Sequence, residues 1–239
     1  PLRGVTDAIF RTTFAECFSG VAGAVAPFVS TVRGPRIKPK LLKDLLPERN
    51  PLMPVVPQIL GKDPHEFVVM ARALFDLGYD TVNWNLGCPY PMVAKKGRGS
   101  GMLPFPAQID RFIDVVLAAF PGRLSIKTRL GRFDAAEIDA LLPVFNRYPL
   151  NDVILHPRTG VQMYTGTADL ARFEECFALC RHPVGCWAAA SWPTRFWRRR
   201  SAAQKWTKRN AFPASAAITI CCSNVMPRSS SGPPIWCSA

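Results

Sequence analysis

The sequence predicts an α/β fold of the TIM (β/α)8 barrel type that is incomplete, with about six β/α units and an irregular C-terminal tail. Strand-like and helix-like segments alternate through residues 1–184, which indicates right-handed βαβ units around a parallel sheet. Polar residues stand at the carboxyl ends of several successive strand-like segments, where barrels assemble their sites. The second observation favours a barrel over a doubly wound sheet, which has the same alternation.

Five apolar runs are expected to be strands, and four amphipathic stretches are expected to be helices. The strands are 23–30, 55–60, 80–85, 124–128 and 152–156, and the helices are 64–77, 107–120, 135–148 and 168–180. Asp63 and Asp134 are suited to cap two of these helices, because an aspartate side chain accepts hydrogen bonds from free N–H groups. Pro64 fits the first helical turn. Residues 181–184 read as the start of a seventh barrel strand.

The composition allows a sizeable core and argues against several classes of protein. Hydrophobic residues make up 48% of the 239 residues, but no apolar run is long enough to span a bilayer, so no membrane partner is expected. The chain opens without Met and without a signal-peptide pattern, which indicates a fragment that begins inside a gene. The eight cysteines lack metal-ligand spacing, apart from the adjacent Cys221 and Cys222, so we expect no metal and free thiols in a reducing cytoplasm. Nothing in the sequence indicates an oligomeric state.

The net charge of +13 is unevenly distributed. Residues 185–239 hold eight basic and no acidic residues, which leaves 22 basic against 17 acidic residues, or +5, in residues 1–184. The same stretch holds five of the six tryptophans and four of the eight cysteines, without a strand or helix period. We therefore expect a truncated barrel over 1–184 and a non-native tail over 185–239, produced by a reading-frame shift near Val184. The alternative is a disordered, basic, RNA-binding tail.

The most informative segment is "TVNWNLGCPYPMVAKKGRGSGML", from Thr81 to Leu103. A strand ends in Asn85, a tight turn holds Cys88, and three glycines follow at 97, 99 and 101. A cysteine in such a turn is well placed to meet a ligand, and the glycines let the backbone approach that ligand closely.

Four further segments place polar groups near the same end of the predicted barrel. They are "PLRGVTDAIFR" at 1–11, "PQILGKDP" with Gln58, "LSIKTRLG" with Lys127 and Arg129, and "VILHPRTGVQMYTGTADL" with His156 and Arg158. A glutamine amide both donates and accepts hydrogen bonds, so it can bind the N–H and carbonyl groups along the edge of a ring. A lysine within a strand is costly to bury without a partner, which favours a functional role.

Together, these five motifs resemble those of the tRNA-dihydrouridine synthases, over about residues 1–184. The resemblance implies that uridine in tRNA is reduced to 5,6-dihydrouridine, with FMN as cofactor and NADPH as reductant, in the cytoplasm. Cys88 would be the catalytic proton donor, since a thiol is protonated at neutral pH. Many members of the family have Asp at the position of Asn83, a difference expected to leave the mechanism unaffected.

The resemblance also assigns binding roles. Pro1, Leu2, Gly4, Gln58, Lys127 and His156 would bind FMN, and Asn85, Arg129 and Arg158 would bind the substrate. Lys127 would stabilise the negative charge of the reduced flavin, and Arg129 would reach further outward to substrate or phosphate.

The chain departs from the family after Val184. The family's N-G-D/E motif, its later G-R motif that grips the FMN phosphate and its helical C-terminal domain do not occur there. We therefore expect this chain to be an inactive fragment that binds FMN weakly or not at all.

Two other functions stay open from the sequence. One is an FMN-barrel oxidoreductase that acts on a free, pyrimidine-like small molecule. The other is a non-catalytic, basic RNA-binding protein that uses the Arg/Trp tail. The order of the cysteine motif, the glycines and the His-Pro-Arg-Thr segment favours the enzyme that acts on RNA.

Overall fold

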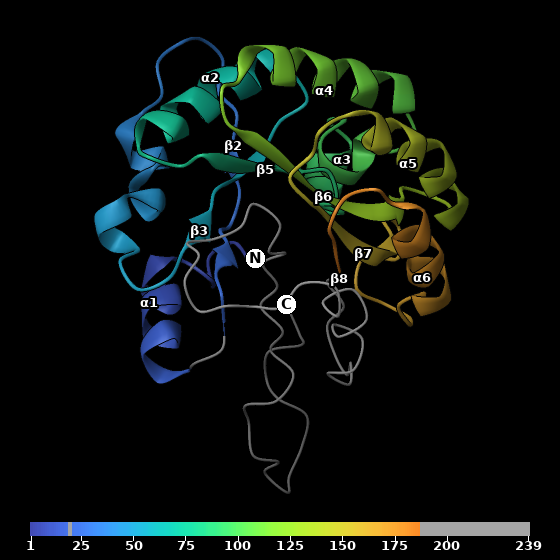
Figure 1. Ribbon diagram of the computed structural model, residues 1–239, viewed down its shortest axis with the longest axis horizontal. Helices are drawn as coiled ribbons and strands as arrows, with labels where there is room; N and C mark the ends of the chain where they lie inside the picture. Colours follow the sequence, from blue (N-terminus) through green and yellow to red (C-terminus); the bar gives the residue numbers. More distant parts are fainter. Residues whose placement is uncertain (19–20, 187–239) are drawn as a thin grey trace, which may run out of the picture. The chain divides into compact units, whose positions relative to one another are not determined.

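The computed structural model describes residues 1–18 and 21–186, and the expected tail beyond 186 lies outside them (Figure 1). The described strands are all parallel. A six-stranded sheet has the order β2 (Val29–Ser30), β4 (Gln58–Leu60), β5 (Thr81–Asn85), β6 (Arg123–Gly131), β7 (Val153–Thr159) and β8 (Val184–Cys186), and a two-stranded sheet pairs β1 (Ala24–Val25) with β3 (Val55–Val56). Neighbours in the sheets follow chain order, as in a (β/α) barrel, which confirms the predicted fold class. The sheet is not closed within the described residues.

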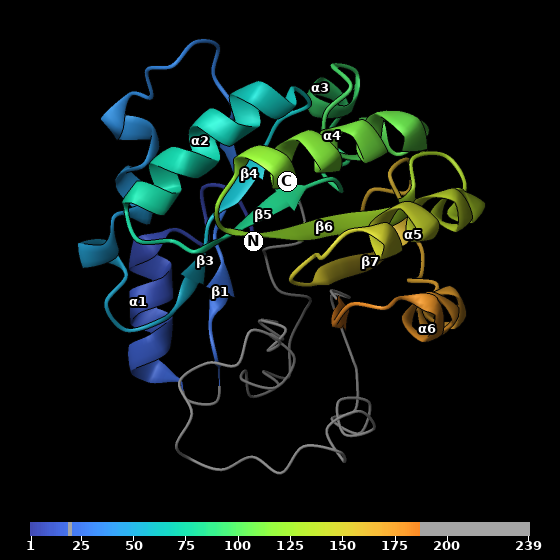
Figure 2. The same ribbon diagram turned by 45° about the horizontal axis from the view of Figure 1, so that its top comes forward.

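Helices alternate with these strands and lie along the outer side of the sheet (Figures 1 and 2). They are α1 (Ala8–Cys17), α2 (Pro64–Asp76), α3 (Pro91–Ala94), α4 (Pro106–Ala119), α5 (Ile138–Arg147) and α6 (Leu170–Leu179), with 3-10 turns at Pro39–Leu41, Lys43–Leu45, Pro47–Arg49, Gly99–Met102 and Ala135–Glu137. The predicted caps are confirmed. Asp63 accepts hydrogen bonds from two N–H groups of α2, and Asp134 forms a capping box with Glu137.

Two predicted strands prove to be interrupted. The run 23–30 divides into β1 and β2 around Pro27, and the run 55–60 divides into β3 and β4 around Pro57. Proline has no backbone N–H and cannot donate to a ladder, so each continuous strand becomes two short segments. The seventh strand expected from residue 181 is present as β8, which pairs with β7 from Val184 to Cys186.

The outer face of the sheet is apolar and is covered by α2 and α4. Trp84 of β5 is fully buried, and its ring stacks on that of Phe112 of α4, with centroids 3.8 Å apart. Phe67 of α2 contacts both rings edge-on. The indole N–H donates to the carbonyl of Gly61 at 3.0 Å. This packing fixes β5 in the sheet and directs its alternate side chains to the opposite face.

That opposite face is polar. Asn83 pairs in register with Ser125, and Asn85 pairs with Lys127, so four polar residues of β5 and β6 lie on one side of the sheet. No helix within residues 1–18 and 21–186 combines the length and apolar character needed to cross a membrane.

Candidate active site

Cys88 lies in a tight turn directly after β5, and Asn85 shapes this turn. The side-chain Oδ1 of Asn85 accepts hydrogen bonds from the backbone N–H groups of Gly87 and Cys88, at 3.2 and 2.9 Å. Gly87 packs closely here, since a Cβ would lie 3.1 Å from the carbonyl carbon of Thr128, tighter than an ordinary contact. The Cys88 thiol is free and the residue is half-buried, so the sulfur is held in place at the edge of solvent.

A glycine-containing loop folds back onto the Cys88 turn. Ser100 donates two hydrogen bonds to the carbonyl of Cys88, from its N–H and its Oγ, each at 3.0 Å. The loop can approach so closely because residue 99 is a glycine with φ of +56°, and a Cβ there would lie 2.8 Å from the Cys88 carbonyl oxygen. Nη1 of Arg132, just after β6, lies 3.2 Å from Ser100 Oγ. The turn is therefore held from two directions.

Gln58 is fully buried at the start of β4 and is bonded at both ends of its amide. Its Nε2 donates to Oδ1 of Asn83 at 2.7 Å, and its Oε1 accepts from Nδ2 of Asn85 at 2.8 Å. An amide has two N–H groups and two lone pairs, so one of each remains. The role of Gln58 at a flavin edge stays a prediction, and it would use this remaining capacity.

Lys127 lies on the polar face of β6, opposite Asn85. Burial lowers the pKa of Lys127 to about 7, Arg129 lowers it further, and Cys88 acts in the opposite direction. Part of the Lys127 side-chain surface is accessible, and burial of the remainder is the largest cause of the lowered pKa. An anion bound beside it would favour the charged form.

His156 and Arg158 lie close together on β7. Nη1 of Arg158 lies 3.0 Å from Nε2 of His156, and Nη2 donates to the carbonyl of Gly166 at 3.0 Å. The remaining Nε of Arg158 is buried and has no hydrogen-bond partner among the described residues. Burial lowers the pKa of His156 to about 2, and the cations Arg129, Lys127 and Arg158 add to this effect. His156 is therefore neutral.

Arg129 differs from its expected position. The sequence places it further out, toward substrate or phosphate, but its side chain is buried, with 2% of the residue exposed. Its Nη1 donates to the carbonyls of Thr159 and Met163, both at 2.7 Å, and its guanidinium lies 5.4 Å from the ring centre of Tyr164. Arg129 thus holds the loop after β7, because these carbonyls offer its charge buried acceptors.

The N-terminal segment forms a turn before α1. The N–H groups of Val5 and Thr6 donate to the carbonyl of Leu2, and Gly4 has φ of +81°. Arg3 lies over the ring of Phe28, which follows β1. Flavin contacts by Pro1, Leu2 and Gly4 stay predictions.

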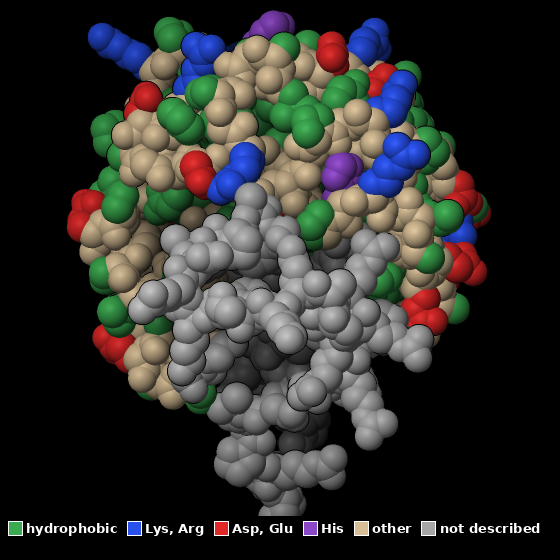
Figure 3. Space-filling model, viewed as in Figure 1, with side chains coloured by type: hydrophobic (Ala, Val, Ile, Leu, Met, Phe, Trp, Pro, Cys, Tyr) green, Lys and Arg blue, Asp and Glu red, His purple; other side chains and the backbone are tan. Residues whose placement is uncertain are grey.

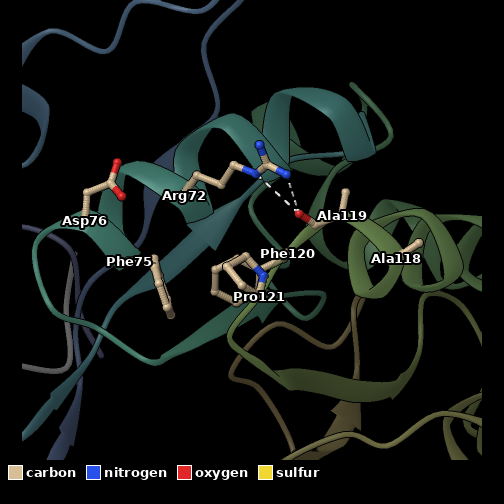
Figure 4. Close-up of a pocket in the computed structure, with 7 residues that line it drawn as sticks. All are labelled: Arg72, Phe75, Asp76, Ala118, Ala119, Phe120 and Pro121. Carbon is tan, nitrogen blue, oxygen red and sulfur yellow. Dashed lines mark hydrogen bonds between the residues drawn. The ribbon is translucent and has the colours of Figure 1, made fainter.

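A surface hollow elsewhere on the described part is not the candidate site. It lies between the carboxyl ends of α2 and α4, where Arg72 donates two hydrogen bonds to the carbonyl of Ala119 (Figure 4). This is the end of the sheet opposite to Cys88, since the helices run against the strands. Both signs of charge are spread over the described surface seen in Figure 3. Among the described residues, no three His, Cys, Asp or Glu side chains are grouped as metal ligands would be.

Several polar residues beside the site are given no role by the comparison of motifs. They are Asn83, Ser100, Ser125, Arg132 and Asp152. Three of them could have been found from the sequence, because polar residues recur at every second position in N-W-N and S-I-K-T-R, and Asp152 stands four residues before His156, on the same alternation, with Ile154 between them. In a strand, that period places them on one face.

The fold and the site together define an α/β-barrel enzyme class with a thiol and a group of basic side chains at the carboxyl end of its strands. Residues 1–182 match the family model described as dihydrouridine synthase (Dus). The chain therefore belongs to the dihydrouridine synthase family.

Individual relatives agree with the family match. The chain is 28% identical over 188 residues to a probable tRNA-dihydrouridine synthase of Rhodobacter capsulatus, which covers 77% of this chain and 56% of that protein. It is 31% identical over 176 residues to one of Staphylococcus epidermidis, with 68% and 50% covered. It is 36% identical over 112 residues to probable tRNA-dihydrouridine synthase 2 of Bacillus subtilis, with 46% and 34% covered. The chain spans about half the length of the first two relatives.

The donor set of the site fits a flavin. Arg129 and Arg158 direct their hydrogen bonds to carbonyls and to an imidazole. Salt-bridged carboxylates in the described part pair elsewhere, as Asp44 does with Arg11. The Nε of Arg158 is a buried hydrogen-bond donor that has no acceptor among the described residues, so it can donate to a ligand. A ring rich in carbonyl groups, with an anionic phosphate and an anionic reduced form, matches such a surplus of donors and positive charge.

Proposed function

We propose that this chain carries the catalytic part of a tRNA-dihydrouridine synthase, which reduces uridine in tRNA to 5,6-dihydrouridine with FMN as cofactor and NADPH as reductant in the cytoplasm. The observation that supports this most strongly is the free thiol of Cys88, fixed by Asn85 at the same end of the sheet as Lys127. Gln58, Lys127 and His156 would hold the flavin ring, with Pro1, Leu2 and Gly4 beside it. FMN, once reduced, supplies a hydride for one carbon of the uracil double bond.

Cys88 supplies the proton for the other carbon. Its thiol is free and half-buried, so it can hold a proton at Sγ until the base is in place. The positive charge of Lys127 would stabilise the thiolate that remains after transfer, since Cys88 is one of the groups that raise the pKa of Lys127. Solvent then returns a proton to sulfur.

Neutral His156 and the charged arginines have separate tasks. An imidazole that cannot be protonated at neutral pH offers a hydrogen bond without adding charge. Arg158 holds this ring in one orientation, and its own Nε stays available to an acceptor on the ligand. Arg129 keeps the loop after β7 in place through Thr159 and Met163.

The charge near Cys88 favours RNA over a free pyrimidine. No acidic residue occurs between Asp80 and Asp110, whereas Lys95, Lys96 and Arg98 lie in the segment directly after the cysteine turn. Lysine and arginine side chains bind phosphates through charge, independently of base sequence. A free uracil or uridine has no phosphate to use them.

A single-turnover assay tests this proposal. The chain, in excess over tRNA that lacks dihydrouridine, is mixed with saturating FMN and NADPH, and the digested tRNA is analysed for dihydrouridine by mass spectrometry. Saturating FMN is used because weak binding is expected. Because the chain lacks the N-G-D/E and G-R motifs and is expected to be inactive at ordinary FMN concentrations, we expect only a small amount of dihydrouridine in the wild-type reaction under these forcing conditions, and none with Cys88→Ala.

The outcomes separate the alternatives. Reduction of free uridine in preference to tRNA would point to the small-molecule oxidoreductase. Stoichiometric FMN on the purified chain would contradict the expected weak binding, whereas an FMN absorption spectrum that is unchanged by the chain at every concentration would count against the cofactor assignment for this part of the barrel. RNA binding without FMN binding would favour the non-catalytic, RNA-binding function.

A further inference from the structure

A continuous chain of side-chain hydrogen bonds crosses the polar face of the sheet beneath the Cys88 turn. Ser125 donates its hydroxyl hydrogen to Oδ1 of Asp152 at 2.7 Å, and its Oγ accepts from Nδ2 of Asn83 at 2.6 Å. Oδ1 of Asn83 accepts from Nε2 of Gln58 at 2.7 Å. Oε1 of Gln58 accepts from Nδ2 of Asn85 at 2.8 Å, and Asn85 then accepts the N–H of Cys88.

The direction of every bond in this chain is fixed from both ends. At one end, the backbone N–H groups of Gly87 and Cys88 can only donate, so Asn85 must present its oxygen to them. At the other end, both carboxyl oxygens of Asp152 lie beside donors, Oδ1 beside the Ser125 hydroxyl and Oδ2 beside the Asn151 amide. Burial raises the pKa of Asp152, but the hydrogen bonds from Ser125 and Asn151 oppose this rise, so we take Asp152 as the acceptor and Ser125 as the donor. These two requirements agree at each intermediate amide. A reversed amide anywhere would bring two donors or two acceptors together.

Four of the five members of this network are buried and Asp152 is half-buried, which raises the cost of any mismatch. Gln58 and Asn83 have no exposed surface, and Ser125 is 2% exposed. In such surroundings an unsatisfied polar group is expensive, and aligned hydrogen bonds polarise one another. Asp152 has a second donor in Nδ2 of Asn151 at 2.7 Å, which keeps its carboxylate in place.

We infer that Asp152, Ser125 and Asn83 are positioning residues, which set the orientation of the Gln58 and Asn85 amides and thereby hold the Cys88 turn in its reactive position. This part of the inference rests on the proposed function: the three residues determine whether the Gln58 amide presents a donor or an acceptor to the flavin. None of the three needs to contact substrate or cofactor. Asp152 acts across four strands, from the start of β7 to the end of β5.

Amide hydrogen exchange followed by NMR tests this inference without FMN or tRNA. Ser125→Ala removes the link between Asp152 and Asn83, and we expect the amides of Gly87 and Cys88 to exchange about fivefold faster, because Asn85 loses its fixed orientation. Thr81→Val is the matched control. Thr81 is also a buried hydroxyl, on β5, but it bonds to Asp80 and Arg123 and lies outside the chain. It should leave those two amides unchanged relative to the core.

A rescue variant tests the role of Asp152 as the acceptor that ends the chain. Asp152→Ala should speed exchange at Gly87 and Cys88. Asn83→Asp in the same protein places a carboxylate where both Gln58 and Ser125 can donate to it, so the chain of hydrogen bonds from Asn85 ends two bonds earlier with the same polarity. The double variant Asn83→Asp/Asp152→Ala should restore slow exchange to within about twofold of the wild type. A residue that merely supports the start of β7 would not be rescued from position 83.

The outcomes decide the inference. Unchanged exchange in Ser125→Ala, or no restoration by Asn83→Asp, would overturn it. If Ser125→Ala does not fold, the Asp152→Ala pair gives the same decision at a less buried position. FMN affinity, measured by fluorescence quenching in the same variants, should fall with Ser125→Ala and not with Thr81→Val. If the exchange results hold and FMN does not bind at all, the positioning network stands and the proposed function fails.

Discussion

Nη1 of Arg158 lies 3.0 Å from Nε2 of His156, and this contact fixes the tautomer of the imidazole. Arginine has donors and no acceptor, so Nε2 of His156 must accept, and the ring proton of the neutral form must be on Nδ1. His182 provides the opposite case. Its Nε2 lies 2.9 Å from the carbonyl of Phe145, which can only accept, so the proton of His182 is on Nε2.

The two histidines should therefore show opposite tautomers by nitrogen NMR at neutral pH. Arg158→Met should shift the tautomer balance of His156, because the contact that requires Nε2 to accept is lost. It should also raise the pKa of His156 above about 2, because a neighbouring cation is lost although burial remains the main cause of the lowered value. His182, at a different place on the fold, should not respond. A wild-type His156 with its proton on Nε2 would contradict the geometry.

Lys127 should reduce the stability of the fold at neutral and acidic pH. Its folded pKa of about 7 is below the unfolded value of 10.5, so the unfolded chain binds more protons between these values. The contribution of Lys127 to stability therefore rises as the pH increases from about 7 to about 10.5. Lys127→Met should stabilise the protein by a few kcal/mol at about pH 6 and by much less at about pH 10.

Urea unfolding of both proteins at these two pH values checks this prediction. Lys62→Met is a suitable control, since Lys62 is exposed and should give a small, pH-independent change. Equal stabilisation by Lys127→Met at both pH values would show that the ammonium group is solvated.

Gly99→Ala should displace the Cys88 turn, whereas Gly97→Ala should not. Both glycines have positive φ, +56° and +65°, so each alanine costs about 1 kcal/mol of backbone strain. A Cβ at 99 would also lie 2.8 Å from the Cys88 carbonyl oxygen, while a Cβ at 97 would meet only the Lys62 side chain at 3.8 Å. We expect a further loss of about 1–3 kcal/mol in Gly99→Ala.

The alkylation rate of Cys88, followed by peptide mass spectrometry, reports the position of the turn. The exposed Cys17 serves as an internal standard in the same sample. The rate at Cys88 relative to Cys17 should change in Gly99→Ala and stay constant in Gly97→Ala. The same change in both variants would mean that backbone strain, and not contact with Cys88, is responsible.

The regular elements could be predicted from the sequence because their signals are local. The caps Asp63 and Asp134 lie within three residues of the N–H groups that they bind. The divisions at Pro27 and Pro57 could also have been foreseen, since proline cannot donate to a ladder. The structure of residues 31–54 could not be predicted in this way. This segment is held by the buried Arg11, which bonds to Asp44 and Asn50 across more than 30 residues, and no periodicity in the sequence indicates such a contact.

In the candidate site, too, local features could be predicted from the sequence and long-range contacts could not. The Cys88 turn could be predicted because Asn85, Gly87 and Cys88 are contiguous. The inward position of Arg129 could not, because its acceptors are carbonyls 30 and 34 residues away in the chain. Asn83, whose replacement of an aspartate was expected to be neutral for the mechanism, bridges Gln58 and Ser125. Its role became visible only once β4, β5 and β6 were in register.

The most direct measurement compares wild type, Cys88→Ala and Cys88→Ser for single-turnover formation of dihydrouridine in tRNA, with FMN saturation verified in each. If Cys88 is the proton donor, Cys88→Ala should lower the rate about 100- to 10,000-fold at unchanged FMN affinity, since general acid catalysis contributes that much. Cys88→Ser, a weaker acid, should recover little of it. Reduction by Cys88→Ala at the wild-type rate would contradict the central claim that this thiol completes the reduction.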